Sequence, residues 1–254
     1  MSDLTTAFEK LIEVMLELRE KCPWDKKQTN DTLRYLTLEE CYELSDAIID
    51  KDDNAIKEEL GDILLHVVFY SILGSEKKKF NLKDVIISQT KKLIDRHPHI
   101  YANVKVKDEK EVKRNWELLK LKEPNKRSVL SGVPKSLPAM LKSYRIQEKV
   151  KGIGFDFSDN QSAFNKVLEE INEFNDEMKQ NNMEKAEEEF GDILFALIGY
   201  AQKNGINAVN ALEKTNKKFI KRFSKIEDLI SKEKKHISDY SIDELDSFWK
   251  LMKD

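Results

Sequence analysis

The chain has few of the residues that break helices or build disulfide frameworks. Its 254 residues include only eight glycines, five prolines and two cysteines. So little glycine and proline, together with 36% charged residues, disfavours a protein of short strands and tight turns and favours one rich in helices. Cys22 and Cys41 fit neither a Cys-x-x-Cys nor a Cys/His metal spacing, and we interpret both as reduced thiols.

Long apolar runs and a strong net charge are also absent. The most apolar run, residues 63–73, is shorter than the ~20 residues that a membrane-spanning helix needs. The polar start of the chain lacks the apolar centre of a signal peptide. A formal charge of −3 provides no general basic field for nucleic acid or an anionic membrane. We therefore expect a cytoplasmic protein that binds neither a membrane nor nucleic acid.

What the chain does contain is an acidic pattern that occurs twice. Each copy reads Glu-Glu-x-x-Glu, then fifteen further residues, then Glu-x-x-Asp. Every acid of the second copy lies 130 positions after its counterpart, although the segments between the acids barely resemble each other. The five pairs are Glu39 and Glu169, Glu40 and Glu170, Glu43 and Glu173, Glu59 and Glu189, and Asp62 and Asp192. A spacing that is kept while its surroundings differ indicates a duplicated site.

Apolar residues recur at intervals of three and four along nearly the whole chain. This periodicity predicts an all-α protein. Thr29, Asn30 or Asp31 can cap the helix that carries the first acids, and Ser241 with Glu244 forms a capping box for a last short helix. The expected helices span residues 32–49, about 54–73, 82–96, 164–178, 183–203 and 206–230.

The middle of the chain concentrates its turn-forming residues. Three of the five prolines lie between positions 124 and 138, together with several serines, which indicates a linker. We predict a helical domain over residues 1–122, a linker over 123–138 and a second helical domain over 139–254. Each half carries one copy of the acidic pattern.

Helical geometry brings the acids of one copy together. Residues three or four apart lie on the same helix face, so Glu40 and Glu43 point the same way, as do Glu59 and Asp62. If the two helices pack antiparallel, as their short connection implies, four carboxylates converge and repel each other without a counter-ion. Hard divalent cations with oxygen ligands, chiefly Mg²⁺ or Mn²⁺, resolve this repulsion, and Mg²⁺ commonly binds substrate phosphate as well.

A solvated acidic face paired with lysines is the alternative interpretation of these acids. It suits a single Glu-x-x-Glu pair, but it does not explain a repeated spacing of five acids. A second argument against it is that Asp62 and Asp192 lead into the most apolar helix of each copy, where an unpaired charge would be costly.

Cations suited to phosphate also recur. Lys92 and Arg96 lie four residues apart on one expected helix, and Lys218 and Arg222 repeat this arrangement 126 positions later. An arginine holds phosphate through two parallel hydrogen bonds, while a lysine acts as a point charge. We predict that both pairs bind substrate phosphate.

Several segments resemble those of one known family, the two-domain MazG-type nucleoside triphosphate pyrophosphohydrolases, over nearly the whole chain. The resemblance implies tandem helical-bundle domains of the all-α NTP pyrophosphatase type, Mg²⁺ dependence, a homodimer, and cleavage of nucleoside triphosphates to monophosphate and pyrophosphate. The segments that carry it are Cys22-Pro23-Trp24-Asp25, Gln28-Thr29, Glu39-Glu40-x-x-Glu43, Glu58-Glu59-Leu60-Gly61-Asp62, Arg96-His97-Pro98-His99, Gly154-Phe155-Asp156, Lys166-x-x-Glu169-Glu170-x-x-Glu173, Glu188-Glu189-Phe190-Gly191-Asp192 and Asn216-x-Lys218-Phe219-x-x-Arg222-Phe223.

The resemblance also implies roles for individual residues. The substrate-contacting bases fall on Lys166, Lys218 and Arg222, and Asn216 lies beside the nucleotide. Leu36 stands where Lys166 stands in the second copy, so we expect the second copy to be the better catalyst. The metal ligands fall on Glu170, Glu173, Glu189 and Asp192, with Glu40, Glu43, Glu59 and Asp62 as their counterparts.

Four residues have further predicted roles. We predict that Glu169 orients the attacking water and that Lys166 stabilises charge on the phosphates. Trp24 could stack on a nucleobase, although an aromatic residue at a helix junction is more often a packing anchor. We interpret His66, on an apolar helix, as a core histidine with a hydrogen-bonded partner.

Two other classes of protein compete with this interpretation. A di-iron carboxylate bundle requires two Glu-x-x-His motifs, but only Glu233 to His236 fits, in a charged tail. A non-catalytic helical scaffold or regulator would keep the acids for solubility alone. It has no need of ten acids in register, so the hydrolase remains the leading hypothesis.

Overall fold

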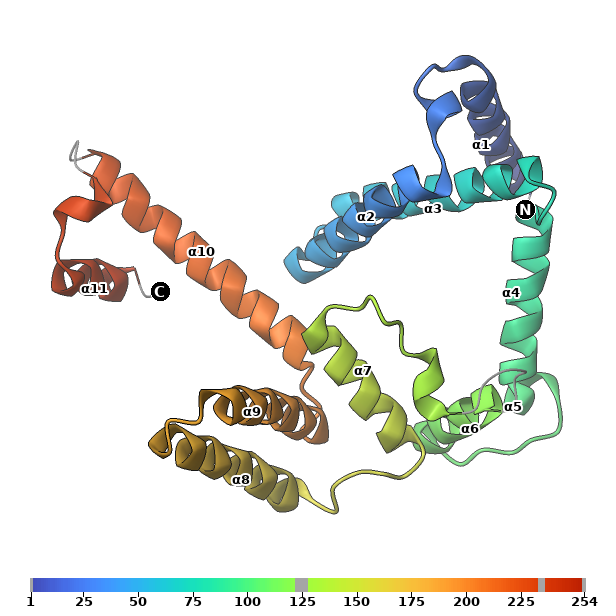
Figure 1. The fold of residues 1–254 in the computed structure, drawn as a ribbon. Helices are drawn as coiled ribbons and strands as arrows, with labels where there is room; N and C mark the ends of the chain where they lie inside the picture. Colours follow the sequence, from blue (N-terminus) through green and yellow to red (C-terminus); the bar gives the residue numbers. More distant parts are fainter. Residues whose placement is uncertain (1, 122–127, 233–235, 253–254) are drawn as a thin grey trace. The chain divides into compact units, whose positions relative to one another are not determined.

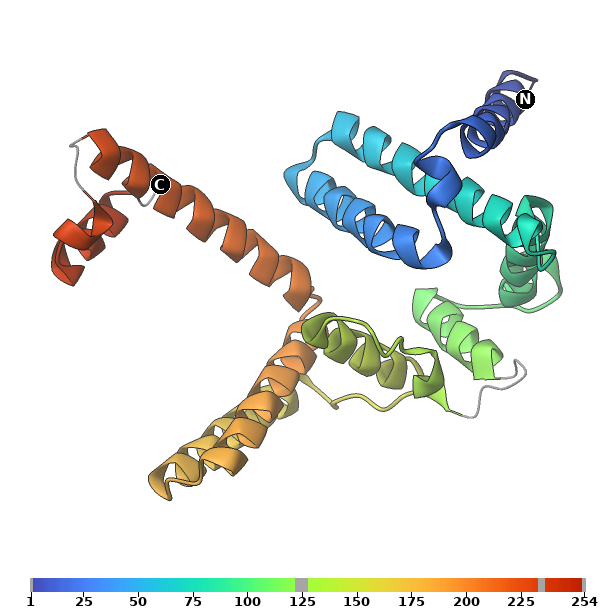
Figure 2. The ribbon, with the colours of Figure 1, turned by 45° about the horizontal axis from the view of Figure 1, so that its top comes forward.

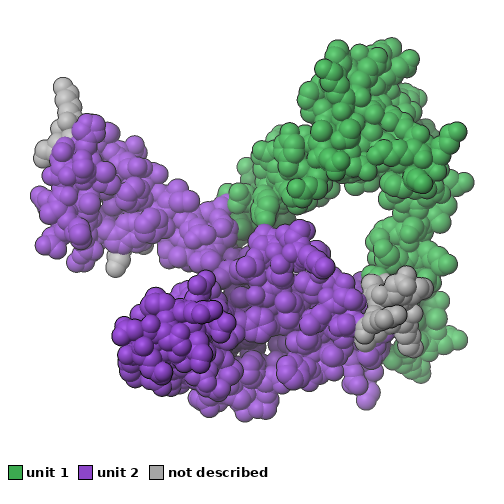
Figure 3. All heavy atoms as spheres, in the orientation of Figure 1, with its two compact units in different colours: residues 1–105 green, residues 106–254 purple. Residues whose placement is uncertain are grey.

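The computed structural model describes residues 2–121, 128–232 and 236–252. Within these ranges the chain forms helices and no strand, which confirms the predicted all-α fold (Figure 1). None of these helices combines the length and the hydropathy that a membrane span requires. The residues fall into two compact units, 1–105 and 106–254 (Figure 3).

Unit 1 begins with a helix that packs on the third. Its helices are α1 (Ser2–Lys21), the 3-10 helix η1 (Asp25–Lys27), α2 (Asn30–Asp50), α3 (Asp53–Glu76), α4 (Leu82–Arg96) and α5 (Pro98–Tyr101). The sequence predicted α4 within its observed limits and α2 and α3 within a few residues. The short helix α5 takes the place of the expected turn around His97-Pro98-His99.

Unit 2 repeats this order after an additional helix. Its helices are α6 (Glu109–Leu121), η2 (Val129–Gly132), α7 (Ala139–Gly152), α8 (Asn160–Lys179), α9 (Met183–Lys203), α10 (Ala208–Lys232), η3 (Ile237–Asp239) and α11 (Ile242–Leu251). The helices α6 and α7 were missed, although Val112, Trp116 and Leu119 give α6 the spacing of a half-buried stripe. The predicted domain limits at 122 and 138 stay a prediction, because residues 122–127 lie outside the described ranges.

The helices that carry the acids form one antiparallel pair in each unit, α2 with α3 and α8 with α9 (Figures 1 and 2). The two connecting turns have the same construction. Lys51 and Asn181, 130 positions apart, both adopt the left-handed conformation, with φ of 58° and 55°. The next residues, Asp52 and Asn182, cap α3 and α9 with their side chains. The expected antiparallel packing is thus confirmed, and it rests on equivalent turns with different sequences.

The starts of α2 and α8 are equivalent as well. Thr29 caps α2 in a capping box with Thr32, and Asp159 caps α8 in a capping box with Ser162. These caps satisfy backbone N–H groups that the first helical turn leaves without partners. Thr29 was one of three predicted caps, and the predicted box of Ser241 and Glu244 at the start of α11 is confirmed.

The core of unit 1 lies between α1, α2 and α3. Met15, Leu33, Val68, Phe69 and Leu73 are its buried members. At the end of α1, the Arg19 guanidinium pairs with Glu76 at 2.7 Å and also donates to the carbonyl of Gln28 at 3.2 Å. This arginine ties the loop before α2 to the end of α3.

In unit 2, α7 occupies against α9 the place that α1 has against α3. Gln147 donates to the carbonyl of Phe195 at 2.6 Å, and Gln202 donates to that of Tyr144 at 2.8 Å. The helices approach so closely that a Cβ at Gly199 would lie 2.5 Å from the Gln147 side-chain oxygen. The buried residues of α8 and α9 include Ala163, Ala186 and Ala196 together with Val167 and Ile198. Ala163 stands where Leu33 stands in unit 1, and Ala196 where His66 stands, so these two positions carry smaller side chains in unit 2.

Candidate active site

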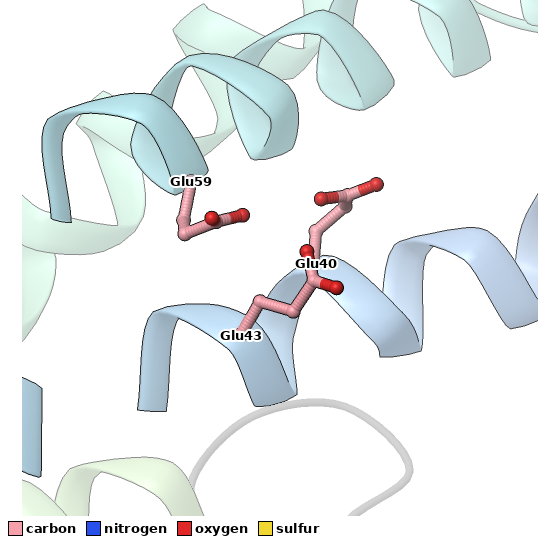
Figure 4. Close-up of side chains that lie close together, drawn as sticks. All are labelled: Glu40, Glu43 and Glu59. Carbon is pink, nitrogen blue, oxygen red and sulfur yellow. The ribbon is translucent and has the colours of Figure 1, made fainter. Parts of the chain in front are cut away.

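Three carboxylates of the N-terminal copy meet between α2 and α3. Glu40, Glu43 and Glu59 each place a carboxylate oxygen within 4.8 Å of the others, and Figure 4 shows their side chains projecting into the space between the two helices. Glu40 and Glu59 are half-buried, and Glu43 is exposed. One oxygen of Glu59 is buried without a hydrogen-bond partner, which leaves an acceptor to be satisfied inside the cluster.

Within the residues that the structure describes, no lysine or arginine pairs with the N-terminal cluster. Burial, followed by repulsion from Asp62, Glu43 and Glu59, raises the pKa of Glu40 above its usual value. Burial and the charges of Glu43 and Asp62 likewise raise the pKa of Glu59. These carboxylates therefore resist ionisation as long as no positive charge lies among them.

Asp62 takes part in this repulsion although it is exposed to solvent. Asp192 is exposed too. The argument that these two residues suffer from burial in an apolar helix is therefore wrong. Val68, Phe69 and Leu73 of α3 and Ile198 of α9 are buried, whereas both aspartates lie one turn after the third carboxylate, on the side open to water.

The C-terminal copy brings together the equivalent residues Glu170, Glu173 and Glu189, again within 4.8 Å of one another. Here a cation joins them. Lys166 pairs with Glu170 at 2.8 Å and with Glu169 at 2.6 Å. Glu170 is buried, with 6% of its surface exposed, so the lysine compensates the least hydrated carboxylate of the cluster.

The electrostatics of the C-terminal cluster follow from this lysine. A hydrogen bond with Glu170, then burial and repulsion by Glu170 and Glu189, raises the pKa of Glu173, and Lys166 opposes the rise. Hydrogen bonds to Glu169 and Glu170 in turn raise the pKa of Lys166, which keeps its positive charge. The cluster thus carries its own counter-ion, unlike its N-terminal counterpart.

Both clusters offer a donor set that suits a hard divalent cation. Carboxylate oxygens are the ligands that Mg²⁺ and Mn²⁺ prefer, and three of them already lie close together in each copy. The partnerless oxygen of Glu59 and the raised pKa of Glu173 both indicate carboxylates that lack sufficient positive charge. The residues present therefore fit the metal that the sequence predicts.

The predicted phosphate-binding residues of α10 lie apart from the acids. Figures 1 and 2 show α10 leaving the end of α9 and running away from the α8–α9 pair. The guanidinium carbon of Arg222 lies 4.7 Å from the ring centre of Trp249 on α11, and Asn216 donates to Glu213 at 3.2 Å. Lys218 is exposed. The structure therefore brings Lys166 to the carboxylates but not the three residues of α10.

The remaining predicted substrate contacts are in unit 1. Lys92 and Arg96 lie in the last two turns of α4, which contacts α3 and α5. Trp24 precedes η1 and is 55% exposed, so it does not serve as a buried packing anchor within unit 1. The contacts of these residues with substrate stay predictions.

A polar contact that the sequence reasoning missed lies beside the N-terminal acids. His66 is buried, as predicted, and its Nδ1 lies 2.7 Å from the hydroxyl of Thr37. The signal was present in the sequence, because Thr37 precedes Glu40 by one turn and His66 follows Asp62 by one turn. The Trp249 contact with Arg222 was also missed, since no local pattern relates α10 to α11.

A hollow of about 640 Å³ lies in unit 1 between α1, α3 and the start of α4. Its walls include Ile12, Leu16 and Ile72, and the paired Arg19 and Glu76 line it as well. It contains none of the predicted site residues. The acids instead lie between the two helices of each pair.

Comparison with known proteins gives a consistent result over both copies. The model of the MazG nucleotide pyrophosphohydrolase domain matches residues 28–101 and again residues 158–226. Each match contains one set of acids. The duplication read from the spacing of 130 is therefore a duplication of a whole domain.

Full-length relatives extend this match to nearly the entire chain. The nucleoside triphosphate pyrophosphohydrolase/pyrophosphatase MazG of Thermotoga maritima is 37% identical over all of this chain and 98% of its own length. The nucleoside triphosphate pyrophosphohydrolase of Escherichia coli K12 is 36% identical over 96% of each chain. An uncharacterized protein of Bacillus subtilis, YabN, is 41% identical over 97% of this chain but only 52% of its own.

The family model covers more than half of the chain, in two copies that coincide with the two carboxylate-bearing helix pairs. Two of the relatives align with at least 96% of this chain and of their own length. This chain therefore belongs to the MazG nucleotide pyrophosphohydrolase family.

Proposed function

We propose that this chain is a Mg²⁺-dependent hydrolase of nucleoside triphosphates, yielding the monophosphate and pyrophosphate, and that its C-terminal copy performs most of the hydrolysis. The family and the names of the full-length relatives support the reaction class. The observation that carries the choice of copy is the contact of Lys166 with Glu170. The N-terminal copy has Leu36 in its place.

The metal would be held by Glu170, Glu173, Glu189 and Asp192. Glu170 and Glu173 lie three residues apart on α8, and Glu189 and Asp192 lie three apart on α9, so each helix presents two carboxylates on one face. A bound divalent cation would supply charge neutralisation for the triphosphate and activation of water. Mn²⁺, with the same preference for oxygen ligands, is the expected substitute.

The protein's own groups would bind and orient the substrate. The ammonium group of Lys166 lies at the edge of the carboxylate cluster, where it can stabilise charge that develops on phosphate oxygens. Glu169 is 55% exposed at its side chain and holds Lys166 from the outer side, so it is placed to accept a proton from water. Both roles require groups that are already oriented, which their mutual ion pair provides.

Lys218, Arg222 and Asn216 require a further approach of α10. These three residues can reach the acids in two ways. Either α10 of a second copy supplies them, or α10 of the same chain folds back on substrate binding. A homodimer would meet the first condition. In this proposal the Arg222–Trp249 contact is the resting position of the arginine.

A homodimer is also favoured by the exposed apolar side chains of the two helix pairs. Equivalent positions of α3 and α9 leave large apolar residues partly in water, which is unfavourable when several lie together. These residues are Leu60, Leu64 and Val67 on α3, and Phe190, Leu194 and Leu197 on α9. Leu194→Glu should therefore lower the sedimentation coefficient of the protein from that of a dimer to that of a monomer.

The deciding experiment measures products, not nucleotide loss alone. The parent protein is incubated with each standard NTP and dNTP, with Mg²⁺ or with a chelator, and monophosphate and pyrophosphate are separated and quantified. Equal amounts of the two products, formed only with metal, are expected. Release of inorganic phosphate and a nucleoside diphosphate would contradict the proposed reaction.

A matched control separates the carboxylate site from general effects of charge. Glu187 is an exposed acid on α9, and its counterpart in the first copy is Lys57, so the duplicated pattern does not include it. Glu187→Ala should retain the activity that Glu189→Ala loses. A folded, metal-replete parent that turns over no nucleotide would instead favour the scaffold alternative.

A further inference from the structure

The N-terminal copy contains a buried hydrogen-bonded bridge between the two helices that carry its acids. Thr37 on α2 contacts His66 Nδ1 on α3 at 2.7 Å and the Tyr70 hydroxyl at 2.8 Å. Thr37 also donates to the carbonyl of Leu33 at 3.0 Å. His66 is 6% exposed, and Thr37 and Tyr70 are half-buried. The bonds are therefore partly shielded from water, where leaving one of their groups unpaired would be costly.

The Thr37 hydroxyl is able to serve all three contacts at once. It has one hydrogen and two lone pairs, so when it donates to the Leu33 carbonyl it can also accept from His66 Nδ1–H and from the Tyr70 hydroxyl. The bonds to His66 and Tyr70 cross from α2 to α3 and give the contact between these helices a defined spacing.

The bridge lies next to the carboxylates. Thr37 precedes Glu40 by one turn of α2, and His66 follows Asp62 by one turn of α3. Residues at these spacings share a helix face, so the bridge and the acids belong to the same interface. It therefore fixes the distance between the helices at the place where that distance sets the separation of the carboxylates.

The C-terminal copy lacks this bridge. The counterparts of Thr37 and His66, 130 positions later, are Val167 and Ala196, both buried. Tyr70 has the counterpart Tyr200, but that tyrosine packs against Phe164 with ring centres 5.4 Å apart. The tyrosine at this position thus forms a hydrogen bond in the N-terminal copy and packs against an aromatic ring in the C-terminal copy.

The difference coincides with the difference in counter-ion. In unit 2, Lys166 offsets the charge of the carboxylates. In the described part of unit 1, no lysine or arginine pairs with Glu40, Glu43 or Glu59, whose carboxylate oxygens lie within 4.8 Å of one another. Repulsion among these carboxylates opposes the packing of α2 against α3, and a contact that joins the two helices beside the acids counteracts it.

We propose that the Thr37–His66–Tyr70 bridge is a positioning element of the N-terminal metal site, which holds α2 and α3 at the spacing at which their carboxylates can share one divalent cation. The proposal rests on the metal site of the proposed function. It adds three residues that touch neither metal nor substrate and that act through Glu40, Glu43, Glu59 and Asp62.

The test measures Mn²⁺ binding by calorimetry on the full chain with the C-terminal site removed by Glu173→Ala and Glu189→Ala. Thr37→Val installs the residue of the second copy and keeps the side-chain volume. Loss of an outer partner of metal ligands costs about 10- to 100-fold in affinity, and we expect a weakening of that order. Thr37→Ser, which keeps the hydroxyl, should stay within about threefold of the background chain.

A second substitution separates positioning from general stability. Leu73→Ala removes buried atoms from α3 two turns beyond His66 and leaves the bridge intact, so it should lower the melting temperature without weakening Mn²⁺ binding at 25 °C. Equal weakening by Leu73→Ala and Thr37→Val would overturn the proposal. So would unchanged Mn²⁺ affinity in folded Thr37→Val, or the absence of any Mn²⁺ site in the background chain.

The outcome is independent of nucleotide turnover. If the parent chain released no pyrophosphate but its N-terminal site still bound Mn²⁺ in a manner sensitive to Thr37→Val and rescued by Thr37→Ser, the proposed reaction would fail while the positioning role stood. If instead the parent chain released pyrophosphate but Thr37→Val left Mn²⁺ binding unchanged, the proposed reaction would stand and the positioning role would fail.

Discussion

The two copies present equivalent carboxylates on equivalent helix pairs, but the surroundings of these carboxylates differ. The C-terminal copy places Lys166 among the acids, over a core that is apolar at Val167 and Ala196. The N-terminal copy has Leu36 there, and a buried polar bridge at Thr37 and His66. The difference teaches that a repeated spacing of acids does not fix the charge around them. The proposed division of labour between the two copies depends on this difference in charge.

The sharpest test of this difference removes one ligand from each copy. Glu173→Ala should abolish most pyrophosphate release, by more than the 10- to 100-fold that the loss of an outer partner costs, because it removes a direct carboxylate ligand. Glu43→Ala should leave most of the release intact. The measurement is kcat for pyrophosphate formation under saturating Mg²⁺. Equal losses from both substitutions would show that the copies act as one site.

Exchanging the counter-ion tests whether Lys166 accounts for the difference. Lys166→Leu, which installs the residue of the first copy, should lower kcat by about 10²-fold, as for other groups that stabilise transition-state charge. Lys179→Leu removes a lysine of the same helix that pairs with Asp176 at the surface and serves as the control. If kcat stays unchanged in Lys166→Leu, the lysine has no part in the reaction.

The reverse exchange places a cation in the N-terminal copy. Leu36→Lys, in a chain carrying Glu173→Ala, should lower the raised pKa of Glu40 by supplying the missing positive charge. Turnover by the N-terminal copy should then rise, by up to about tenfold. A rise in metal affinity without turnover would show that the first copy lacks more than a lysine.

The pH dependence of stability should also differ with and without metal. A carboxyl group with a raised pKa in the folded chain adds stability below its unfolded pKa of about 4.3, and this contribution is lost as the pH rises through the folded pKa. Glu40, Glu59 and Glu173 have this sign. The gain in melting temperature on adding Mg²⁺ should therefore be larger at about pH 8 than at about pH 5.

Differential scanning fluorimetry at both pH values, with Mg²⁺ or a chelator, checks this expectation. Glu40→Gln with Glu59→Gln should reduce the pH dependence of the metal-free protein, because these two carboxyl groups lack an internal cation. The same gain from Mg²⁺ at both pH values would contradict the assignment of the raised pKa values to the metal site.

The smallest effect concerns the equivalent turns. Lys51 adopts the left-handed conformation with φ of 58°, which is strained for a residue with a Cβ. Lys51→Gly should increase the free energy of unfolding by about 0.5–1 kcal/mol. Asn181→Gly should change it by a few tenths, since asparagine tolerates this conformation better. Denaturant unfolding of the full chain measures both changes. Destabilisation by Lys51→Gly would show that the left-handed conformation of Lys51 is not strained.

Local sequence signals were sufficient for the elements that carry the site. The limits of α4 and α9 follow from apolar periodicity and end residues, and the caps of α2 and α11 follow from short side chains that accept backbone hydrogen bonds. The helix α6 was missed because its stripe is interrupted by many charges. The exposure of Asp62 and Asp192 was misjudged because periodicity along one helix does not say which residues a neighbouring helix covers.

By itself, the sequence determined the all-α class and the duplication, since both follow from residue spacing. It also predicted which acids hold a metal, from the preference of hard cations for oxygen ligands, and this assignment stays a prediction. Only the tertiary structure decided which groups of different helices meet. It brings Glu189 beside Glu170 and Glu173, stacks Arg222 on Trp249, and joins Thr37 to His66 across two helices. Such contacts depend on how separate helices pack, and no spacing within one helix specifies that.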